Sequence, residues 1–162
     1  MRHSLLITLL FLSLGTFAQT SPKGSPPPLP AAAYLPPVDI SGTWIGELYQ
    51  DDGGIADKFE FGMEIRQIGP SIKGTTYVRL DGLWAEMKFD GVLQTNGSWK
   101  IKEYRVIRAQ KPEELSWCMK RFELTVNFTA DGLVVSGPWW GNSEYGPCIP
   151  GSVRMKRGVK RA

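Results

Sequence analysis

Histidine is almost missing from this sequence of 162 residues, and its single copy, His3, lies in a segment that we expect to be removed. Serine–histidine–aspartate and cysteine–histidine catalysis both need an imidazole base, so neither is expected of the mature chain. Zinc sites draw on histidine and reduced cysteine, and the chain has two cysteines that we expect to be oxidised. The sequence therefore predicts no metal site, no cofactor and no enzyme of these classes.

A strong excess of one charge is also lacking, because 19 basic and 16 acidic residues leave a net charge of +3. That balance, without a basic patch interleaved with aromatic residues, does not predict binding to nucleic acid. One long apolar run is present, from Leu5 to Phe17. It covers about 13 residues, whereas a membrane-spanning helix needs about 20. We therefore expect no transmembrane segment.

The beginning of the chain is typical of a secretory signal peptide. A basic start that includes Arg2 is followed by the apolar run, and the small residues Thr16 and Ala18 stand where a signal peptidase reads them. We expect residues 1–18 to be removed and the protein to be exported. A retained membrane anchor is the alternative.

Proline is concentrated in the next segment, residues 19–37, which holds seven prolines between Pro22 and Pro37. Such a composition favours extended polyproline II structure and does not form a packed core, so we expect a disordered spacer. A docking peptide for a proline-recognition domain is the alternative. One folded domain is expected over residues 38–157, followed by a basic tail at 158–162.

Alternation of apolar and polar residues with a period of two predicts eight β-strands and almost no helix. It is clearest over residues 58–67, where every odd position up to residue 65 is apolar. The expected strands cover residues 43–50, 58–67, 71–80, 85–91, 98–108, 121–128, 133–140 and 152–158. In the fifth, the apolar phase slips between Ile101 and Tyr104, which predicts a β-bulge. Only residues 111–116 could form a helical turn.

Eight consecutive strands predict an all-β fold, an antiparallel up-and-down barrel whose closure removes free strand edges. A β-sandwich is the competing fold. In a barrel, alternate connections lie at the same end. One end would receive the tight connections at 68–70, 94–97 and 129–132, and the other would receive 51–57, 81–82, 109–117 and 140–151. The mouth of a barrel is a common place for a small-molecule site, so we expect any binding site at the long-connection end.

The two cysteines, Cys118 and Cys148, both fall at that long-connection end. Two cysteines in an exported chain predict a disulfide bond. A redox or nucleophilic role is the alternative, but the chain has no CxxC motif and no histidine base for it.

The motif Ser41-Gly42-Thr43-Trp44 opens the first expected strand, and Arg154 lies on the last. A Gly-x-Trp at this position, with its tryptophan covered by an arginine from the final strand, resembles the lipocalin and fatty-acid-binding (calycin) superfamily. The resemblance spans nearly all of residues 38–157. It implies that Trp44 plugs one end of the barrel, that Arg154 (or Arg157) covers it, and that the other end is the open mouth.

Three further stretches, Gln50–Gly54, Trp117–Lys120 and Cys148–Gly151, look like those of a group of exported bacterial proteins found mostly in the Bacteroidota. This second resemblance implies a periplasmic or extracellular location and supports the fold. It implies no activity.

Aromatic residues gather at the long-connection end and are the candidate ligand-binding residues. They are Tyr49, Trp84, Trp117, Trp139, Trp140 and Tyr145. Aromatic faces suit sugars, flat hydrophobic ligands or the apolar patch of a partner protein. Because adjacent residues of a strand point to opposite faces, one of Trp139 and Trp140 should point into the barrel and the other outward. The many large inward residues favour a shallow mouth over a deep chamber.

The sequence therefore predicts an exported, non-catalytic barrel that binds a small hydrophobic, aromatic-stacking or sugar-like ligand at its long-connection end. A packed barrel that serves as a protein-interaction module, with a partner in the cell envelope, is the main alternative. A small hydrolase is the other. Its rim carboxylates would come from Glu47, Asp51, Asp81 and Glu144.

Overall fold

The computed structural model describes residues 38–130 and 132–158, and every regular element within them is a β-strand. The strands are β1 (Gly42–Gln50), β2 (Lys58–Ile68), β3 (Ser71–Leu80), β4 (Leu83–Leu93), β5 (Trp99–Gln110), β6 (Met119–Thr129), β7 (Gly132–Ser143), β8 (Gly146–Pro147) and β9 (Gly151–Arg157). Each of the eight expected strands is present to within about three residues at either end. In place of the helical turn considered for residues 111–116 there is an irregular segment with a single turn.

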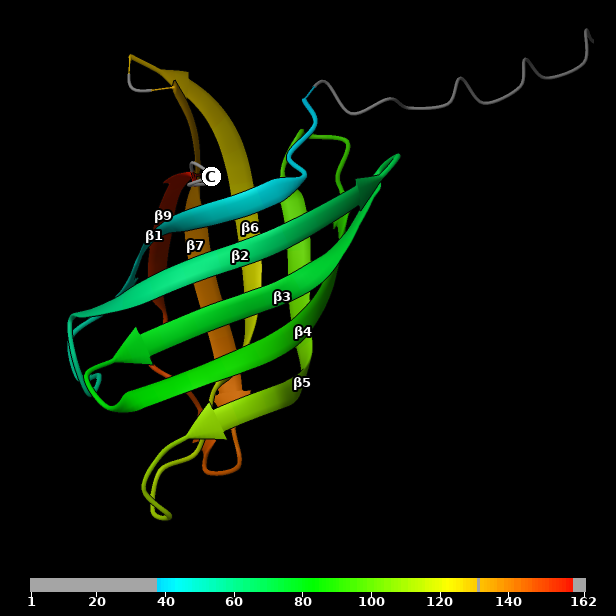
Figure 1. Ribbon diagram of the computed structural model, residues 1–162. Helices are drawn as coiled ribbons and strands as arrows, with labels where there is room; N and C mark the ends of the chain where they lie inside the picture. Colours follow the sequence, from blue (N-terminus) through cyan, green and yellow to red (C-terminus); the bar gives the residue numbers. More distant parts are fainter. Residues whose placement is uncertain (1–37, 131, 159–162) are drawn as a thin grey trace, which may run out of the picture. The chain divides into compact units, whose positions relative to one another are not determined.

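Eight of the strands close into an antiparallel barrel (Figure 1). They follow the order β6-β5-β4-β3-β2-β1-β9-β7, and the pairing of β6 with β7 completes the ring. The short strand β8 pairs only with β7 and lies outside the ring. The predicted all-β barrel is therefore confirmed, and the β-sandwich alternative is wrong.

Side chains that point inward fill most of the barrel. In β2 the buried residues are the four apolar ones at positions 59, 61, 63 and 65, as the alternation predicts. The largest buried side chains of the core include Trp44, Met63, Met87, Phe89, Phe122 and Met155. An eight-stranded barrel is just wide enough for such side chains to meet at its axis. Free space is therefore expected only toward an end.

Strand β5 is the irregular part of the ring. Its register against β4 shifts twice and leaves Tyr104 and Ile107 as extra residues, so the bulge predicted from the phase slip is confirmed at Tyr104. On its other side, β5 pairs with β6 only over Trp99–Lys102. From Glu103 onward β5 leaves β6, and residues 104–110 are all exposed. The barrel is thus less tightly closed along this seam.

One end of the barrel is closed around Trp44, which is fully buried. Its indole Nε1 donates a hydrogen bond to the carbonyl oxygen of Ile40 at 2.8 Å. The guanidinium of Arg157 lies over the indole ring, 5.4 Å from its centroid. Arg157 also donates to the carbonyl oxygens of Asp39 (2.7 Å) and Ser41 (3.2 Å), so it ties the residues before β1 to the last strand.

The arginine that covers Trp44 is therefore Arg157, the second residue that the resemblance allowed, and not Arg154. The reason is register. Arg157 lies directly opposite Trp44 in the pairing of β1 with β9, whereas Arg154 lies opposite Glu47. Residues opposite each other in an antiparallel pair share a face, so Arg154 points outward with Glu47 and is exposed.

The long connections are gathered at the other end, at the lower left of Figure 1. They are 51–57, 111–118 and 144–150, the last of which contains β8, and they lie with the two-residue turn 81–82. In that turn Asp81 has a φ of 49°, a backbone conformation that Asp-Gly hairpins favour. The loop asymmetry read from the sequence is thus reproduced in the barrel.

A disulfide bond joins Cys118 to Cys148, with their Cα atoms 6.3 Å apart, as predicted. It ties the connection 111–118 to the connection 144–150. Replacing both cysteines by alanine should lower the free energy of unfolding by about 3–4 kcal/mol, because the bond closes a loop of 30 residues in the unfolded chain. Urea unfolding of the oxidised protein and of the variant measures the difference, and a loss below about 1 kcal/mol would contradict a stabilising role.

The expected signal peptide (1–18), the spacer (19–37) and the tail after Gly158 lie outside the described residues. Among the residues that the structure does describe, no helix is long and apolar enough to cross a bilayer.

Candidate ligand-binding site

A cavity of about 130 Å³ lies at the long-connection end of the barrel. Its wall is largely apolar and includes Leu48, Phe59, Val78, Leu83, Leu115 and Trp139. Phe59 and Val78 are buried, inward residues of β2 and β3, so the alternation that builds the core also supplies the apolar wall of the cavity. The connection 111–118, which the disulfide holds, supplies Leu115 and Trp117.

Two of the six aromatic candidates line this cavity, Trp117 and Trp139. Trp139 points inward and is 2% exposed, and its Nε1 donates to the carbonyl oxygen of Tyr49 at 2.8 Å. Its neighbour Trp140 is 42% exposed on the outer face. The expectation that one ring of the pair points inward and the other outward is therefore confirmed, with Trp140 as the outward ring.

The other three aromatic candidates also lie away from the cavity. Tyr49 and Trp84 stand at outward positions of β1 and β4, and Tyr145 is 73% exposed on the connection between β7 and β9. The indole Nε1 of Trp84 donates to Gln110 Oε1 at 3.1 Å, and the Arg108 guanidinium lies 5.9 Å from the centre of its ring. These three rings lie at the same end of the barrel as the cavity, but they point away from it and are not part of one site.

Tyr49, at an outward position of β1, is part of a polar cluster on the outer surface. Its hydroxyl donates a hydrogen bond to the carboxylate of Glu47, which raises the pKa of Tyr49. The same hydrogen bond, followed by the ammonium of Lys58 at 2.9 Å, lowers the pKa of Glu47. A general acid in glycoside cleavage needs a raised pKa, so Glu47 is shifted in the wrong direction for that role.

The other rim acids give the hydrolase alternative no further support. Asp51, Asp81 and Glu144 are exposed, and they are absent from the wall of the cavity as the described residues define it. Within the same described part of the chain, no group of three or more histidine, cysteine or acidic residues is placed to hold a metal ion.

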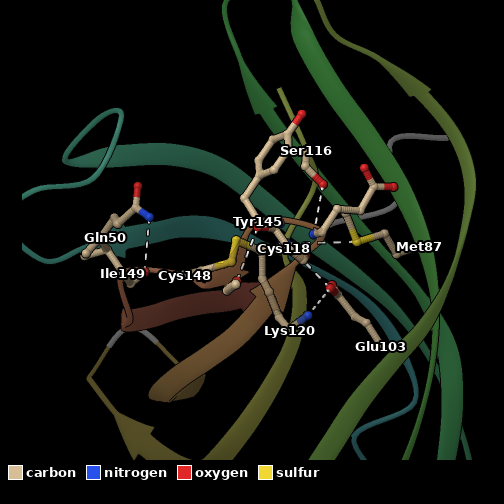
Figure 2. The surroundings of a disulfide bond; sticks show 12 residues. Gln50, Met87, Glu103, Ser116, Cys118, Lys120, Tyr145, Cys148 and Ile149 are labelled. Atoms are coloured by element: carbon tan, nitrogen blue, oxygen red, sulfur yellow. Dashed lines mark hydrogen bonds and ion pairs between the residues drawn. A yellow bond between two sulfur atoms is a disulfide. The ribbon is translucent and has the colours of Figure 1, made fainter. Parts of the chain in front are cut away.

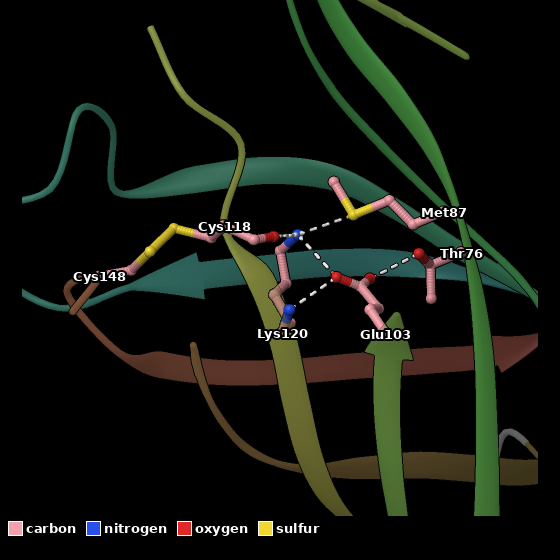
Figure 3. A network of polar contacts seen from close by, with 6 residues as sticks. All are labelled: Thr76, Met87, Glu103, Cys118, Lys120 and Cys148. Carbon is pink, nitrogen blue, oxygen red and sulfur yellow. Dashed lines mark hydrogen bonds and ion pairs between the residues drawn. A yellow bond between two sulfur atoms is a disulfide. The ribbon is translucent and has the colours of Figure 1, made fainter. Parts of the chain in front are cut away.

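The sequence analysis missed a buried ion pair close to the disulfide (Figures 2 and 3). Lys120 Nζ lies 3.5 Å from Glu103 Oε2, and the two side chains are 5% and 0% exposed. Glu103 accepts two further hydrogen bonds, from the hydroxyl of Thr76 at 2.6 Å and from the backbone N–H of Lys120 at 2.8 Å. Lys120 is also part of the cavity wall, so this pair brings buried charge to a largely apolar site.

The ion pair lies where β5 separates from β6, and this position explains why the Glu103 carboxylate binds the backbone N–H of Lys120. Beyond Lys102 the two strands no longer exchange backbone hydrogen bonds, and a buried N–H without a partner is costly. The carboxylate of Glu103 takes the place of the missing backbone carbonyl for Lys120. Lys120 Nζ in turn donates to the carbonyl oxygen of Cys118 at 3.2 Å, which links the pair to the disulfide-bonded connection.

A signal for this pair was present in the sequence. Glu103 follows the inward Ile101 by two positions, and Lys120 precedes the inward Phe122 by two, so alternation places both charges inside the barrel. Lysine and glutamate are almost never fully buried unless they are paired. Two charged residues at inward positions of neighbouring strands therefore predict an internal ion pair.

A scan against protein-family models finds no match to this chain, and neither does a search of curated proteins.

Proposed function

We propose that this protein is an exported, non-catalytic barrel of the calycin type that binds a small hydrophobic ligand in the cavity at its long-connection end. The observation that carries this proposal is the cavity itself, which has an apolar wall and two indole rings, those of Trp117 and Trp139. Small-molecule sites are typically concave and apolar with a few polar groups, and barrel mouths are a common place for them.

The volume sets the size of the ligand. A dry apolar cavity of about 150 Å³ accepts benzene, so about 130 Å³ suits one ring or a short branched chain. A long-chain fatty acid would need the barrel axis, which Met87, Phe89 and Phe122 occupy. The apolar wall also favours a hydrophobic ring over a sugar.

Export is supported by the predicted signal peptide and by the disulfide between Cys118 and Cys148, because disulfides persist in oxidising compartments. The calycin assignment is supported by the Gly-x-Trp motif ending at Trp44 and by the arginine that covers this residue. The non-catalytic role rests on the sequence, which has no histidine after His3.

The second candidate function is a protein-interaction module, and a specific observation favours it. The barrel axis is filled, while Trp140, Tyr145 and Phe128 are 42%, 73% and 77% exposed. On that alternative the partner would be a protein of the cell envelope that contacts the outer surface, and the cavity would stay empty.

Titration with indole, benzyl alcohol and palmitate separates the two functions. A small ring compound at about 100 times its Kd should stabilise the protein by about 2.7 kcal/mol, and palmitate should not. The fluorescence of Trp117 and Trp139 should change with the same midpoint, because both rings line the cavity. Failure of every small ring compound to shift the unfolding temperature would contradict the ligand-binding role.

A pair of matched variants locates the binding. Leu83→Trp should fill the cavity and abolish the stabilisation by ligand, since Leu83 lines it. Val92→Trp, on the outward face of the same strand and 48% exposed, should leave the stabilisation unchanged. Equal effects of the two variants would place the ligand elsewhere.

A further inference from the structure

The charge of the cavity is one-sided. Lys111 and Lys120 are the only charged residues among the described ones that line it. The carboxylate of Glu103 lies behind Lys120 and is not part of the wall. Two lysines and one glutamate leave a net charge of +1 at a site whose other lining residues are uncharged and mostly apolar, with Gln50 and Ser116 as the polar exceptions. The charged groups that face a ligand in this cavity are therefore ammonium groups, and the carboxylate is not one of them.

The ammonium of Lys120 lacks a short hydrogen bond to a charged acceptor. It has three N–H groups, and its contacts are the Cys118 carbonyl at 3.2 Å, Glu103 Oε2 at 3.5 Å and Met87 Sδ at 4.0 Å. A charge-assisted N–H···O bond is usually 2.7–2.9 Å long, so both oxygen contacts are longer than that, and the thioether sulfur is a weak acceptor. Glu103, in contrast, is held by two short bonds from neutral donors. The carboxylate is thus better satisfied than the ammonium.

A second donor in the same wall has no partner. The indole Nε1 of Trp117 is buried and makes no hydrogen bond within the described residues. Among the described residues, the one buried side-chain acceptor without a partner is Gln50 Oε1, and Gln50 also lines the cavity. It packs against Gly54, because a Cβ on that glycine would collide with it, and its amide nitrogen is bound to the Ile149 carbonyl. The described wall of the cavity thus holds one unpartnered donor, the Trp117 indole N–H, and one unpartnered acceptor, Gln50 Oε1, so the preference for an anion rests on the ammonium of Lys120.

We propose that the ligand is a small monocarboxylate with a body the size of one ring, bound with its carboxylate at Lys120 Nζ. This inference rests on the proposed binding function and adds the chemical class of the ligand. A carboxylate oxygen supplies the short charged acceptor that Lys120 lacks, and the indole N–H of Trp117 offers a further donor. The apolar body fits between residues such as Leu48, Leu83 and Trp139.

Three probes of nearly equal size test the charge. Benzoate, benzamide and benzylamine are titrated by calorimetry into the full-length protein with its disulfide intact. Benzoate should bind about tenfold or more tightly than benzamide, which corresponds to ~1.4 kcal/mol, and benzylammonium should bind most weakly. The preference for benzoate should persist at high salt, because Lys120 is buried and screening acts mainly on exposed charges.

Variants assign the preference to Lys120. Lys120→Met combined with Glu103→Gln removes both charges together, and benzoate should then bind no better than benzamide. Glu103→Gln alone removes the opposing charge, so the preference for benzoate should grow. Lys111→Met at the exposed rim should change the preference by no more than about twofold. Trp140→Ala, on the outer face, is the control for nonspecific effects, and circular dichroism confirms that each variant is folded.

The outcomes separate this inference from the proposed function. If benzamide binds as tightly as benzoate, the cavity binds ligands but the anionic class is wrong. If the preference disappears with salt or with Lys111→Met, the charge comes from the rim, and the role of Lys120 is overturned. If none of these probes binds and the neutral ring compounds also fail, the binding function falls and this inference with it.

Discussion

Lys120→Met should lower the free energy of unfolding by about 3–5 kcal/mol, the usual cost of removing one partner from a buried ion pair. The variant leaves the carboxylate of Glu103 inside the barrel with no cation beside it, since both side chains are at most 5% exposed. The shape of the core is nearly conserved because methionine has a similar length. Urea unfolding measures the loss.

The partner variants identify the cause of this loss. Lys120→Met with Glu103→Gln removes both charges and should recover most of the stability, since well-packed neutral side chains often replace a buried pair at little cost. Lys111→Met, at an exposed position, should change the free energy of unfolding by less than about 0.5 kcal/mol. A double variant as unstable as the single one would show that packing, and not charge, is what Lys120 contributes.

Trp44→Ala should be comparably severe and lower the free energy of unfolding by about 3–5 kcal/mol. Trp44 is fully buried, so its removal leaves a cavity, deprives the Ile40 carbonyl of its hydrogen bond and takes away the ring under Arg157. Thermal or urea unfolding gives the value. Trp140→Ala is the matched control on the outer face and should cost less than about 1 kcal/mol. Similar losses from the two variants would contradict the assignment of Trp44 as the plug.

Much of the fold could be predicted because it depends on local patterns. Alternation of apolar residues located the strands, and the lengths of the connections placed the long ones at one end. The phase slip before Tyr104 located a bulge, because an extra residue in one strand disturbs the alternation directly. The disulfide followed from two cysteines in a chain expected to be exported, and the topology agreed because both cysteines fall at the same end.

The site was harder to predict because it depends on which face each residue takes and on register between distant strands. Tyr49 and Trp84 lie at the right end of the barrel but point outward from their strands. Arg154 and Arg157 differ by three positions, and only the register of β9 against β1 shows which one reaches Trp44. Lys120 and Glu103 obey the alternation, and the chain order suggests that β5 and β6 are neighbours. Whether the two side chains meet depends on the register of β5 against β6, which the chain order does not give.

If the proposed ligand binding holds, the early parting of β5 from β6 bears on the rate at which the ligand would enter and leave the barrel. In a ring with eight complete ladders, widening the wall requires several backbone hydrogen bonds to break together. Here residues 104–110 of β5 share no ladder with β6, and Glu103 spans the gap with its side chain. A ligand that passed beside this seam would wait for side-chain and loop motions, which take nanoseconds to microseconds, and would not need paired strands to separate.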